Sequence, residues 1–264
     1  MKKSSPALLL LLLSVALCSA HDTWLSPSSY SAAPGESVSF ALTSGTEFPK
    51  LDSAIKPERV ARAGFRLAGA EEKLTEFKPA ERSLRFEQSF TREGVATVWL
   101  QLAAKDIELT DEDVAHYLEE IRASADVEQA WAAQKGKEKW KELYTKCAKT
   151  FVSIGNSTAD ESWQEPVGLT LEIIPLQNPT TIRAGATAKF KLLRNGEPLP
   201  NATVILHNAQ PKPIYARTNV EGIATFEFAN PGLAMLTSSQ LRPPQQGKPW
   251  ESEFTTITFE VAAE

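Results

Sequence analysis

Glu93-Gly94-Val95-Ala96-Thr97-Val98 places a turn glycine directly before a run of apolar and β-branched residues that extends to Leu102. The same arrangement returns in Glu221-Gly222-Ile223-Ala224-Thr225-Phe226. Glycine tolerates the positive φ angles of tight turns, and alternating residues of this kind favour a strand with one buried face. Each half of the chain therefore contains a turn that begins a β-strand.

A second pair of motifs precedes this one in each half. Pro34-Gly35 is followed by Phe40 and Leu42, and Ala184-Gly185 is followed at the same spacing by Phe190 and Leu192. Either pair alone could arise from common turn chemistry. The two pairs in the same order indicate a duplicated sandwich domain.

Short β-like runs bounded by Pro, Gly and Asn occupy both ends of the chain. Their length and spacing are typical of antiparallel β-sandwiches. We therefore predict a mainly β fold with two tandem Ig-like sandwiches, the first over residues 21–105 and the second over 165–264. The expected strands include residues 37–42, 84–86, 95–102, 168–174, 187–193, 202–207, 223–228, 233–236 and 254–261.

The intervening segment has helical periodicity. Thr110 and Asp113 form a capping-box pattern before an apolar stripe that includes Val114, Tyr117 and Leu118. A second helix is expected at about 126–134. Apolar residues at helical spacing from Trp140 onward suggest a third, with Cys147 on its buried side. The sequence thus predicts a three-helix insert over residues 106–153.

The first twenty residues have the pattern of a cleavable signal peptide. Two lysines precede an apolar run too short to span a bilayer, and Cys18-Ser19-Ala20 supplies the small residues of a cleavage site. Cleavage after Ala20 leaves 244 of the 264 residues and removes Lys2 and Lys3, so 26 basic residues remain against 33 acidic ones, a net charge of −7. We expect a periplasmic or secreted protein.

Composition also bears on the expected partners. No later apolar stretch approaches the ~20 residues of a membrane-spanning helix, and no Lys/Arg run suggests a nucleic-acid partner. After cleavage Cys147 is the one remaining cysteine, so an intramolecular disulfide is excluded. The chain has no GxSxG, HExxH, P-loop or dinucleotide glycine motif, and we expect that it is not an enzyme.

Cleavage after Ala20 would make His21 the first residue. An N-terminal histidine offers a metal ion both its α-amine, with a pKa of roughly 7.7 to 8.0, and its imidazole. The other histidines are His116, expected on a helix surface, and His207, at the end of a predicted strand. His21 and His207, with Asp22 as a direct or orienting ligand, would suit Cu(II) or Ni(II). The alternative is that Asp22 simply begins a strand and that His207 anchors a loop.

An ordered set of motifs resembles a bacterial family of exported two-sandwich proteins of uncharacterised function, often labelled periplasmic nickel or cobalt uptake components. The set includes His21-Asp22-Thr23-Trp24-Leu25, Pro34-Gly35-Glu36, His116-Tyr117-Leu118-Glu119-Glu120, Arg183-Ala184-Gly185 and Trp250-Glu251-Ser252. The resemblance implies metal binding near His21. It also implies a histidine where this chain has Gln240, and an amide is a poorer ligand. The second half is also similar to regulatory sandwich modules of exported peptidases.

These observations support two hypotheses of different kinds. The first is a periplasmic protein that binds nickel, cobalt or copper through His21, Asp22 and His207, with His116 and Gln240 as weaker candidates, and that serves an uptake system. The second is a non-catalytic interaction module that binds an outer-membrane receptor, a protein or a glycan through its sandwich loops. A copper site with oxidative activity, as in lytic polysaccharide monooxygenases, is a third and weaker interpretation.

Overall fold

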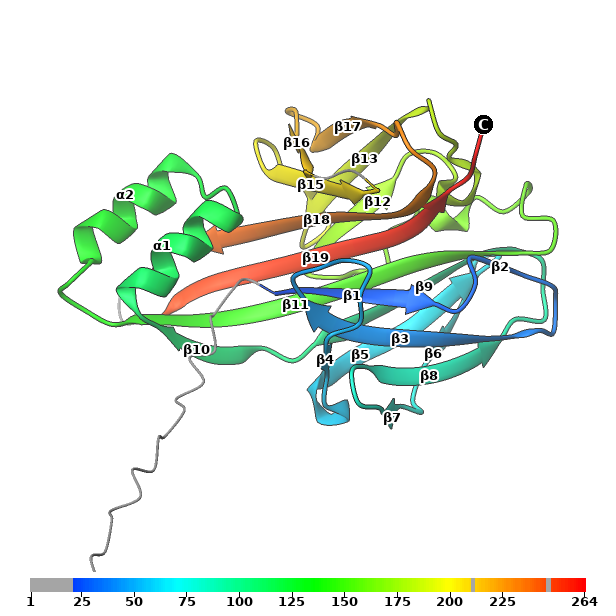
Figure 1. The fold of residues 1–264 in the computed structure, drawn as a ribbon, viewed down its shortest axis with the longest axis horizontal. Coiled ribbons are helices and arrows are strands. Elements are labelled where there is room, and N and C mark those ends of the chain that lie inside the picture. Colours follow the sequence, from blue (N-terminus) through cyan, green and yellow to red (C-terminus); the bar gives the residue numbers. More distant parts are fainter. Residues whose placement is uncertain (1–20, 210–211, 246–247) are drawn as a thin grey trace, which may run out of the picture.

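The structure, a computed structural model, describes residues 21–209, 212–245 and 248–264. The predicted signal peptide, residues 1–20, lies outside the described residues. Strands dominate the described part of the chain, in which two α-helices project at one end (Figure 1). The predicted mainly β fold with two sandwiches is confirmed. The described residues also form three short 3-10 helices, at Pro57–Arg59, Ser162–Gln164 and Pro179–Thr181.

The first half contains a small sheet. Its order is β1-β3-β8-β7, with β4 paired to β3. The strands are β1 (Asp22–Pro27), β3 (Ser37–Gly45), β4 (Ser53–Ala54), β7 (Lys78–Pro79) and β8 (Leu84–Ser89).

A large sheet runs through both halves in the order β16-β15-β18-β19-β11-β9-β5-β6, and β2 and β10 pair with β11. The first half contributes β2 (Ser31–Ala32), β5 (Val60–Leu67), β6 (Ala70–Lys73), β9 (Gly94–Leu102), β10 (Lys105–Leu109) and β11 (Trp140–Ile154). The second half contributes β15 (Thr203–Asn208), β16 (Ile214–Arg217), β18 (Gly232–Arg242) and β19 (Trp250–Val261).

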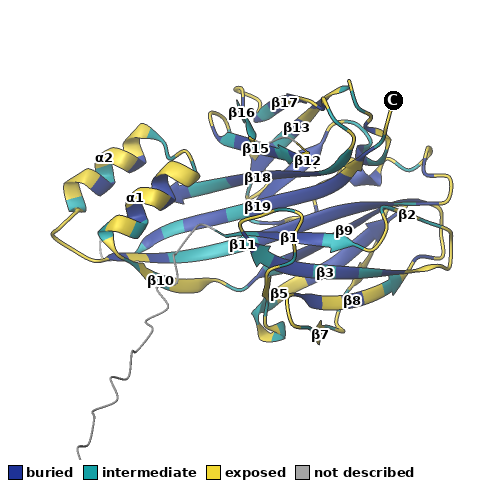
Figure 2. Ribbon diagram, in the orientation of Figure 1, coloured by how far each residue is buried: buried dark blue, intermediate teal, exposed yellow. Residues whose placement is uncertain are grey.

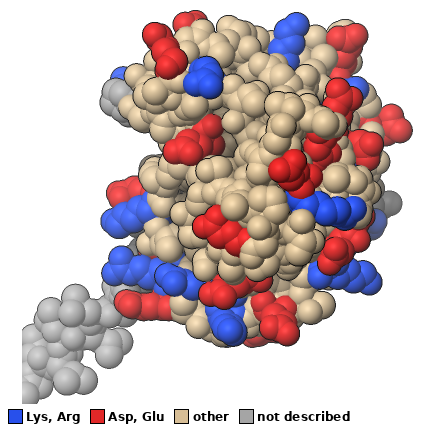
Figure 3. Space-filling model, turned by 90° about the vertical axis from the view of Figure 1, so that its right-hand side faces the viewer, with Lys and Arg blue, Asp and Glu red and all other residues tan. Residues whose placement is uncertain are grey.

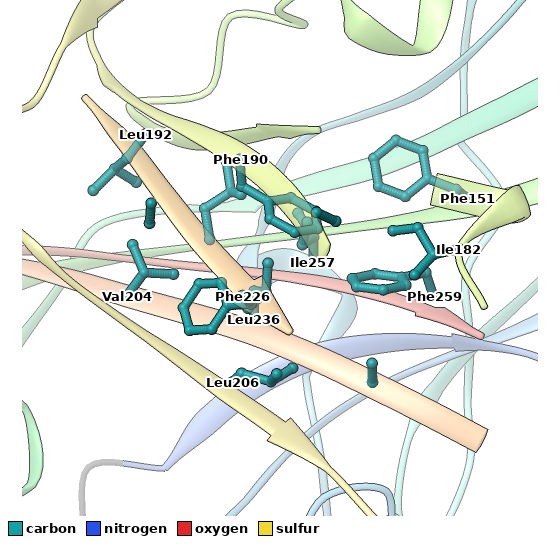
Figure 4. Close-up of a cluster of buried hydrophobic side chains, with 14 of the residues drawn as sticks. Phe151, Ile182, Phe190, Leu192, Val204, Leu206, Phe226, Leu236, Ile257 and Phe259 are labelled. Atoms are coloured by element: carbon teal, nitrogen blue, oxygen red, sulfur yellow. The ribbon is translucent and has the colours of Figure 1, made fainter. Parts of the chain in front are cut away.

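A second small sheet belongs to the second half. In it β13 (Thr187–Arg194) pairs with β12 (Leu171–Pro175), β14 (Glu197–Pro198) and β17 (Ile223–Glu227). Its inner face packs against the large sheet through an aromatic and aliphatic core. Phe190, Phe226 and Phe259 lie within this core (Figure 4).

The two halves repeat one strand arrangement. In the first half, the small sheet contains β1, β3 and β8, and the large sheet contains β6, β5, β9 and β11. In the second half, the equivalent small-sheet strands are β12, β13 and β17. The equivalent strands in the large sheet are β16, β15, β18 and β19. This is the Greek-key division of Ig-like sandwiches. The Phe40 and Phe190 motifs fall on the equivalent strands β3 and β13. The Gly94 and Gly222 motifs form the beginnings of strands that are not equivalent, β9 and β17, so their likeness reflects turn chemistry.

The halves join through the pairing of β11 with β19, which is parallel and extends over nine residue pairs from Glu142↔Trp250 to Thr150↔Thr258. Successive residues of a strand point to opposite faces. Ala148 and Val152 therefore pack into the first core, while Phe151 packs into the second. The two small sheets consequently cover opposite faces of the large sheet, and β11 is buried on both sides (Figure 2).

The helical segment is shorter than predicted. It consists of α1 (Asp111–Glu120) and α2 (Ala125–Gln134), inserted between β10 and β11. The capping box at Thr110 and Asp113 is present. The predicted third helix is wrong, because Trp140–Ile154 forms β11. A strand buried on both faces loses the two-residue alternation, and its remaining apolar positions happened to fit helical spacing.

The two helices pack on the extended ends of the large sheet. Trp140 of β11 stacks on Trp250 of β19 with ring centroids 4.1 Å apart, and Trp131 of α2 meets Trp140 edge-on at 5.3 Å. Trp250 also donates its indole N–H to Gln134, 2.9 Å away. At the opposite end of the molecule, acidic and basic side chains are interspersed on the surface (Figure 3).

Candidate functional site

The first small sheet and the two helices pack on the same face of the large sheet, and a gap lined by both remains between them. The first small sheet covers Ala148 and Val152 of β11, and the helices cover Trp140 on the same face of that strand. β1 begins in this gap (Figure 1). A hydrogen bond holds β1 on the large sheet, since the hydroxyl of Thr256 in β19 donates to the carbonyl oxygen of Thr23 at 2.7 Å.

The gap contains two neighbouring cavities, of about 230 and 220 Å³. His21 lines the first, while Asp22 and His207 both line the second. The ring of Phe254 contributes to both cavities. Consecutive residues at the start of β1 thus face adjoining spaces on either side of one aromatic ring.

Strand alternation places His207 in the second cavity. Val204 and Leu206 of β15 point into the core of the second sandwich. Thr203, Ile205 and His207 therefore point to the opposite face, where they line the cavity. His207 pairs in register with Met235 of β18 and is partly buried.

Asp22 is held beside His207. Its carboxylate accepts a hydrogen bond from the Thr237 hydroxyl at 2.9 Å. Burial raises the pKa of Asp22, although the nearby His207 opposes this, and burial lowers the pKa of His207, although Asp22 opposes that. A lowered pKa keeps the His207 imidazole neutral at pH 7, the form that ligates metal ions. Glu120 of α1 completes an acidic side of the cavity.

His21 is oriented through its main chain. Lys146 of β11 donates a hydrogen bond from its ammonium group to the carbonyl oxygen of His21. The same ammonium lies 5.6 Å from the centre of the Tyr144 ring and 5.5 Å from that of Phe254. The start of β1 is thus held on one side by Lys146 and on the other by the Asp22–Thr237 hydrogen bond.

A buried carboxylate lies in the wall of the first cavity. Glu142 accepts hydrogen bonds from the hydroxyl of Tyr117 at 3.0 Å, the indole N–H of Trp140 at 2.8 Å and the hydroxyl of Ser252. Burial raises the pKa of Glu142, while these hydrogen bonds and the charge of Lys146 oppose the shift. Sequence reasoning missed Glu142 and Lys146. A strand interpretation of 140–154 would have placed both on one face with Tyr144.

The other candidates lie elsewhere. His116 is exposed on α1, as expected for a helix surface residue, and lines neither cavity of the gap. Gln240 lies on β18 in register with Glu253 and lines a separate small cavity near the end of α1. Cys147 is buried against Trp99, Val167 and Leu169.

The side chains alone do not form a three-ligand metal centre. Within the described ranges, no three His, Cys, Asp or Glu side chains are grouped as a metal ion requires. Asp22 and His207 supply two donors in one cavity. A third donor would have to come from His21, through its imidazole or through an α-amine that exists only when the chain begins there.

The sequence of this chain matches a family profile over residues 18–241, that of a domain of unknown function, DUF4198. This chain belongs to the DUF4198 family. That membership supports the expected resemblance to an uncharacterised family. No curated protein matches the chain.

Several solved structures are similar to this DUF4198 protein at low sequence identity. The fibronectin(III)-like modules of Clostridium thermocellum CbhA share 6% identity, with 90% of this chain and 94% of that chain covered and a TM-score of 0.21. The Escherichia coli adhesin FdeC shares 11%, with 94% and 65% covered and a TM-score of 0.24. The Yersinia pseudotuberculosis adhesin InvE shares 11%, with 90% and 58% covered and a TM-score of 0.23. Across the described part of the chain, neither helix has the length and apolar character needed to cross a membrane.

Proposed function

We propose that this DUF4198 protein is exported and binds a divalent transition metal ion at the start of β1, in support of metal uptake or handling. One observation carries the proposal. Asp22 and His207 come from different halves of the chain and line the same cavity, which adjoins the one that His21 lines.

The proposed donors are chemically matched. Removal of the leader after Ala20 would give His21 a free α-amine beside its imidazole, and His207 would add a second imidazole. Nitrogen donors of this kind suit nickel, cobalt and copper. Asp22 is proposed to ligate the ion or to orient His207, a role that carboxylates commonly fill around metal-bound histidine.

The pH dependence of binding follows from the donors. The α-amine must lose its proton to ligate, and its ordinary pKa is roughly 7.7 to 8.0. Burial holds the pKa of His207 below its usual value, so this imidazole is already neutral at pH 7. We therefore expect metal affinity to rise between pH 6 and pH 8, chiefly through the amine.

Isothermal titration with nickel, cobalt and copper tests the proposal. The protein is purified after export, and its first residue is verified by N-terminal sequencing. One ion per chain is expected to bind, and one added Ala before His21 should weaken binding at least about tenfold by blocking the amine. His207→Gln should weaken it similarly, whereas the matched control His116→Gln, on an exposed helix surface, should not.

Two outcomes would overturn the metal proposal. One is the absence of saturable binding for all three ions to protein with a verified His21 terminus. The other is binding that the added Ala and His207→Gln leave unchanged. In either case the alternative of a non-catalytic docking module would gain support.

A further inference from the structure

The cavity beside His21 has charged side chains of opposite sign on one strand. Glu142 and Lys146 both line it, and Tyr144 lies between them. All three point to the same face because they are two residues apart along β11. The α-carbons of Glu142 and Lys146 are about 13 Å apart at the usual strand rise, and both side chains line the same space.

Four of the remaining wall residues are apolar or aromatic, and His21, Ser44 and Ser53 are polar. Ile107 and Leu109 come from β10, Phe254 comes from β19, and Tyr117 comes from α1. The volume of about 230 Å³ is below the roughly 300–1,000 Å³ of sites for drug-sized molecules. The space therefore suits a small compound with an apolar body.

Glu142 indicates that one end of this compound should carry a positive charge. The residue is 3% exposed, and the three hydrogen-bond donors that the described residues supply to it are all neutral groups. No salt bridge to Glu142 occurs among the described residues. A buried carboxylate without a bound countercharge is costly, and a cation that enters beside it is stabilised. The aromatic ring of Tyr117 in the cavity wall also favours a cation.

Lys146 defines the other end. Its ammonium group faces the cavity next to the carbonyl oxygen of His21. A ligand carboxylate placed there would form a charge-assisted hydrogen bond, while the same group near Glu142 would be repelled. The cavity therefore distinguishes the two ends of a dipolar compound.

We propose that this cavity binds a small amino carboxylate, such as an amino acid, with its ammonium group toward Glu142 and its carboxylate toward Lys146. The proposal is independent of the metal, since neither Glu142 nor Lys146 is a proposed metal ligand. It assigns the protein a second, organic ligand at the same end of the molecule.

Ligand-observed NMR on the metal-free exported protein, with the twenty amino acids as probes, tests the proposal. The best binder is then compared by isothermal titration with two analogues, one without its carboxylate and one without its amine. Each analogue should bind at least about tenfold more weakly, because each loses one charge-assisted contact.

Variants locate the binding. Lys146→Met should weaken binding of the amino acid at least about tenfold while leaving that of the analogue without a carboxylate nearly unchanged. Lys141→Met is the matched control, because Lys141 lies on the same strand with 65% of its side chain exposed, and it should have no effect. Lys146 donates none of the three hydrogen bonds to Glu142 described above, and the thermal unfolding of Lys146→Met is measured alongside.

Three results would overturn the proposal. These are no binding of any amino acid at millimolar concentration, equal affinity for the two analogues and the parent compound, and an equal loss with Lys141→Met. Metal binding by the same preparation is measured in a separate titration. Absence of amino-acid binding therefore does not contradict the metal proposal, and absence of metal binding does not contradict the amino-acid proposal.

Discussion

Lys149 of β11 and Glu172 of β12 form an ion pair, Nζ to Oε1 2.8 Å, in which both side chains are almost entirely excluded from solvent. Glu172 also accepts hydrogen bonds from the backbone N–H groups of Val167, Gly168 and Leu169. The pair therefore links the large sheet to the second small sheet. It also holds the segment that connects the two halves, which contains Val167, Gly168 and Leu169.

Removal of the Lys149 charge should destabilise the protein strongly. Lys149→Met leaves Glu172 buried without its cation, a change that typically costs about 3–5 kcal/mol. Urea unfolding measures the free energy. Lys141→Met provides the control, because its pair with Glu108 is exposed and is expected to contribute only about 0–1 kcal/mol. A loss for Lys149→Met no larger than that of the control would contradict this role.

The same pair predicts a specific acid sensitivity. Burial acts to raise the pKa of Glu172, but Lys149 and the backbone N–H groups prevail and lower it below the usual 4.5. A lowered carboxylate pKa contributes stability above its unfolded value and loses it as the pH falls through the folded value. The free-energy difference between wild type and Glu172→Gln should thus shrink below pH 4.5. If the free-energy difference instead grew as the pH fell, the pKa of Glu172 would not be lowered in the folded protein.

Cys147 should be unreactive in the folded protein. The residue is 1% exposed, and burial raises the pKa of its thiol to about 11, so little of the reactive thiolate exists at neutral pH. A chromogenic disulfide reagent should label no cysteine in native protein that begins at His21, and one per chain in guanidinium. Rapid labelling before unfolding would contradict the assignment of Cys147 to the core.

Two turn glycines allow a matched test of close packing. Gly222 has a φ of 76°, and a Cβ there would lie 2.8 Å from the carbonyl oxygen of Leu192; Gly196 has a φ of 84° and nothing within 4 Å. Both alanine variants incur the left-handed backbone cost of roughly 1–2 kcal/mol. Gly222→Ala should add about 1–3 kcal/mol from the steric clash. Equal losses in urea unfolding would show that the Leu192 backbone yields easily.

Local patterns were sufficient to predict the two sandwiches, because turn glycines and alternating residues are short-range signals. β11 was missed because a strand buried on both faces shows no alternation, and tertiary pairing overrode the helical spacing at Trp140–Phe151. The position of Asp22 beside His207 required the parallel β11–β19 contact, which no local pattern encodes. The cavity lined by Glu142 and Lys146 could not be predicted for the same reason, because a helix was expected from Trp140 onward.

The parallel contact between β11 and β19 also constrains the order in which the chain can fold. One edge of β11 stays unpaired along residues 142–150 until residues 250–258 reach it, over a hundred residues later in synthesis. Exposed strand edges invite pairing with other chains, and such distant contacts form slowly. A nascent or truncated chain that ends before Trp250 would therefore present an open, aggregation-prone edge at the centre of what becomes the joint between the sandwiches.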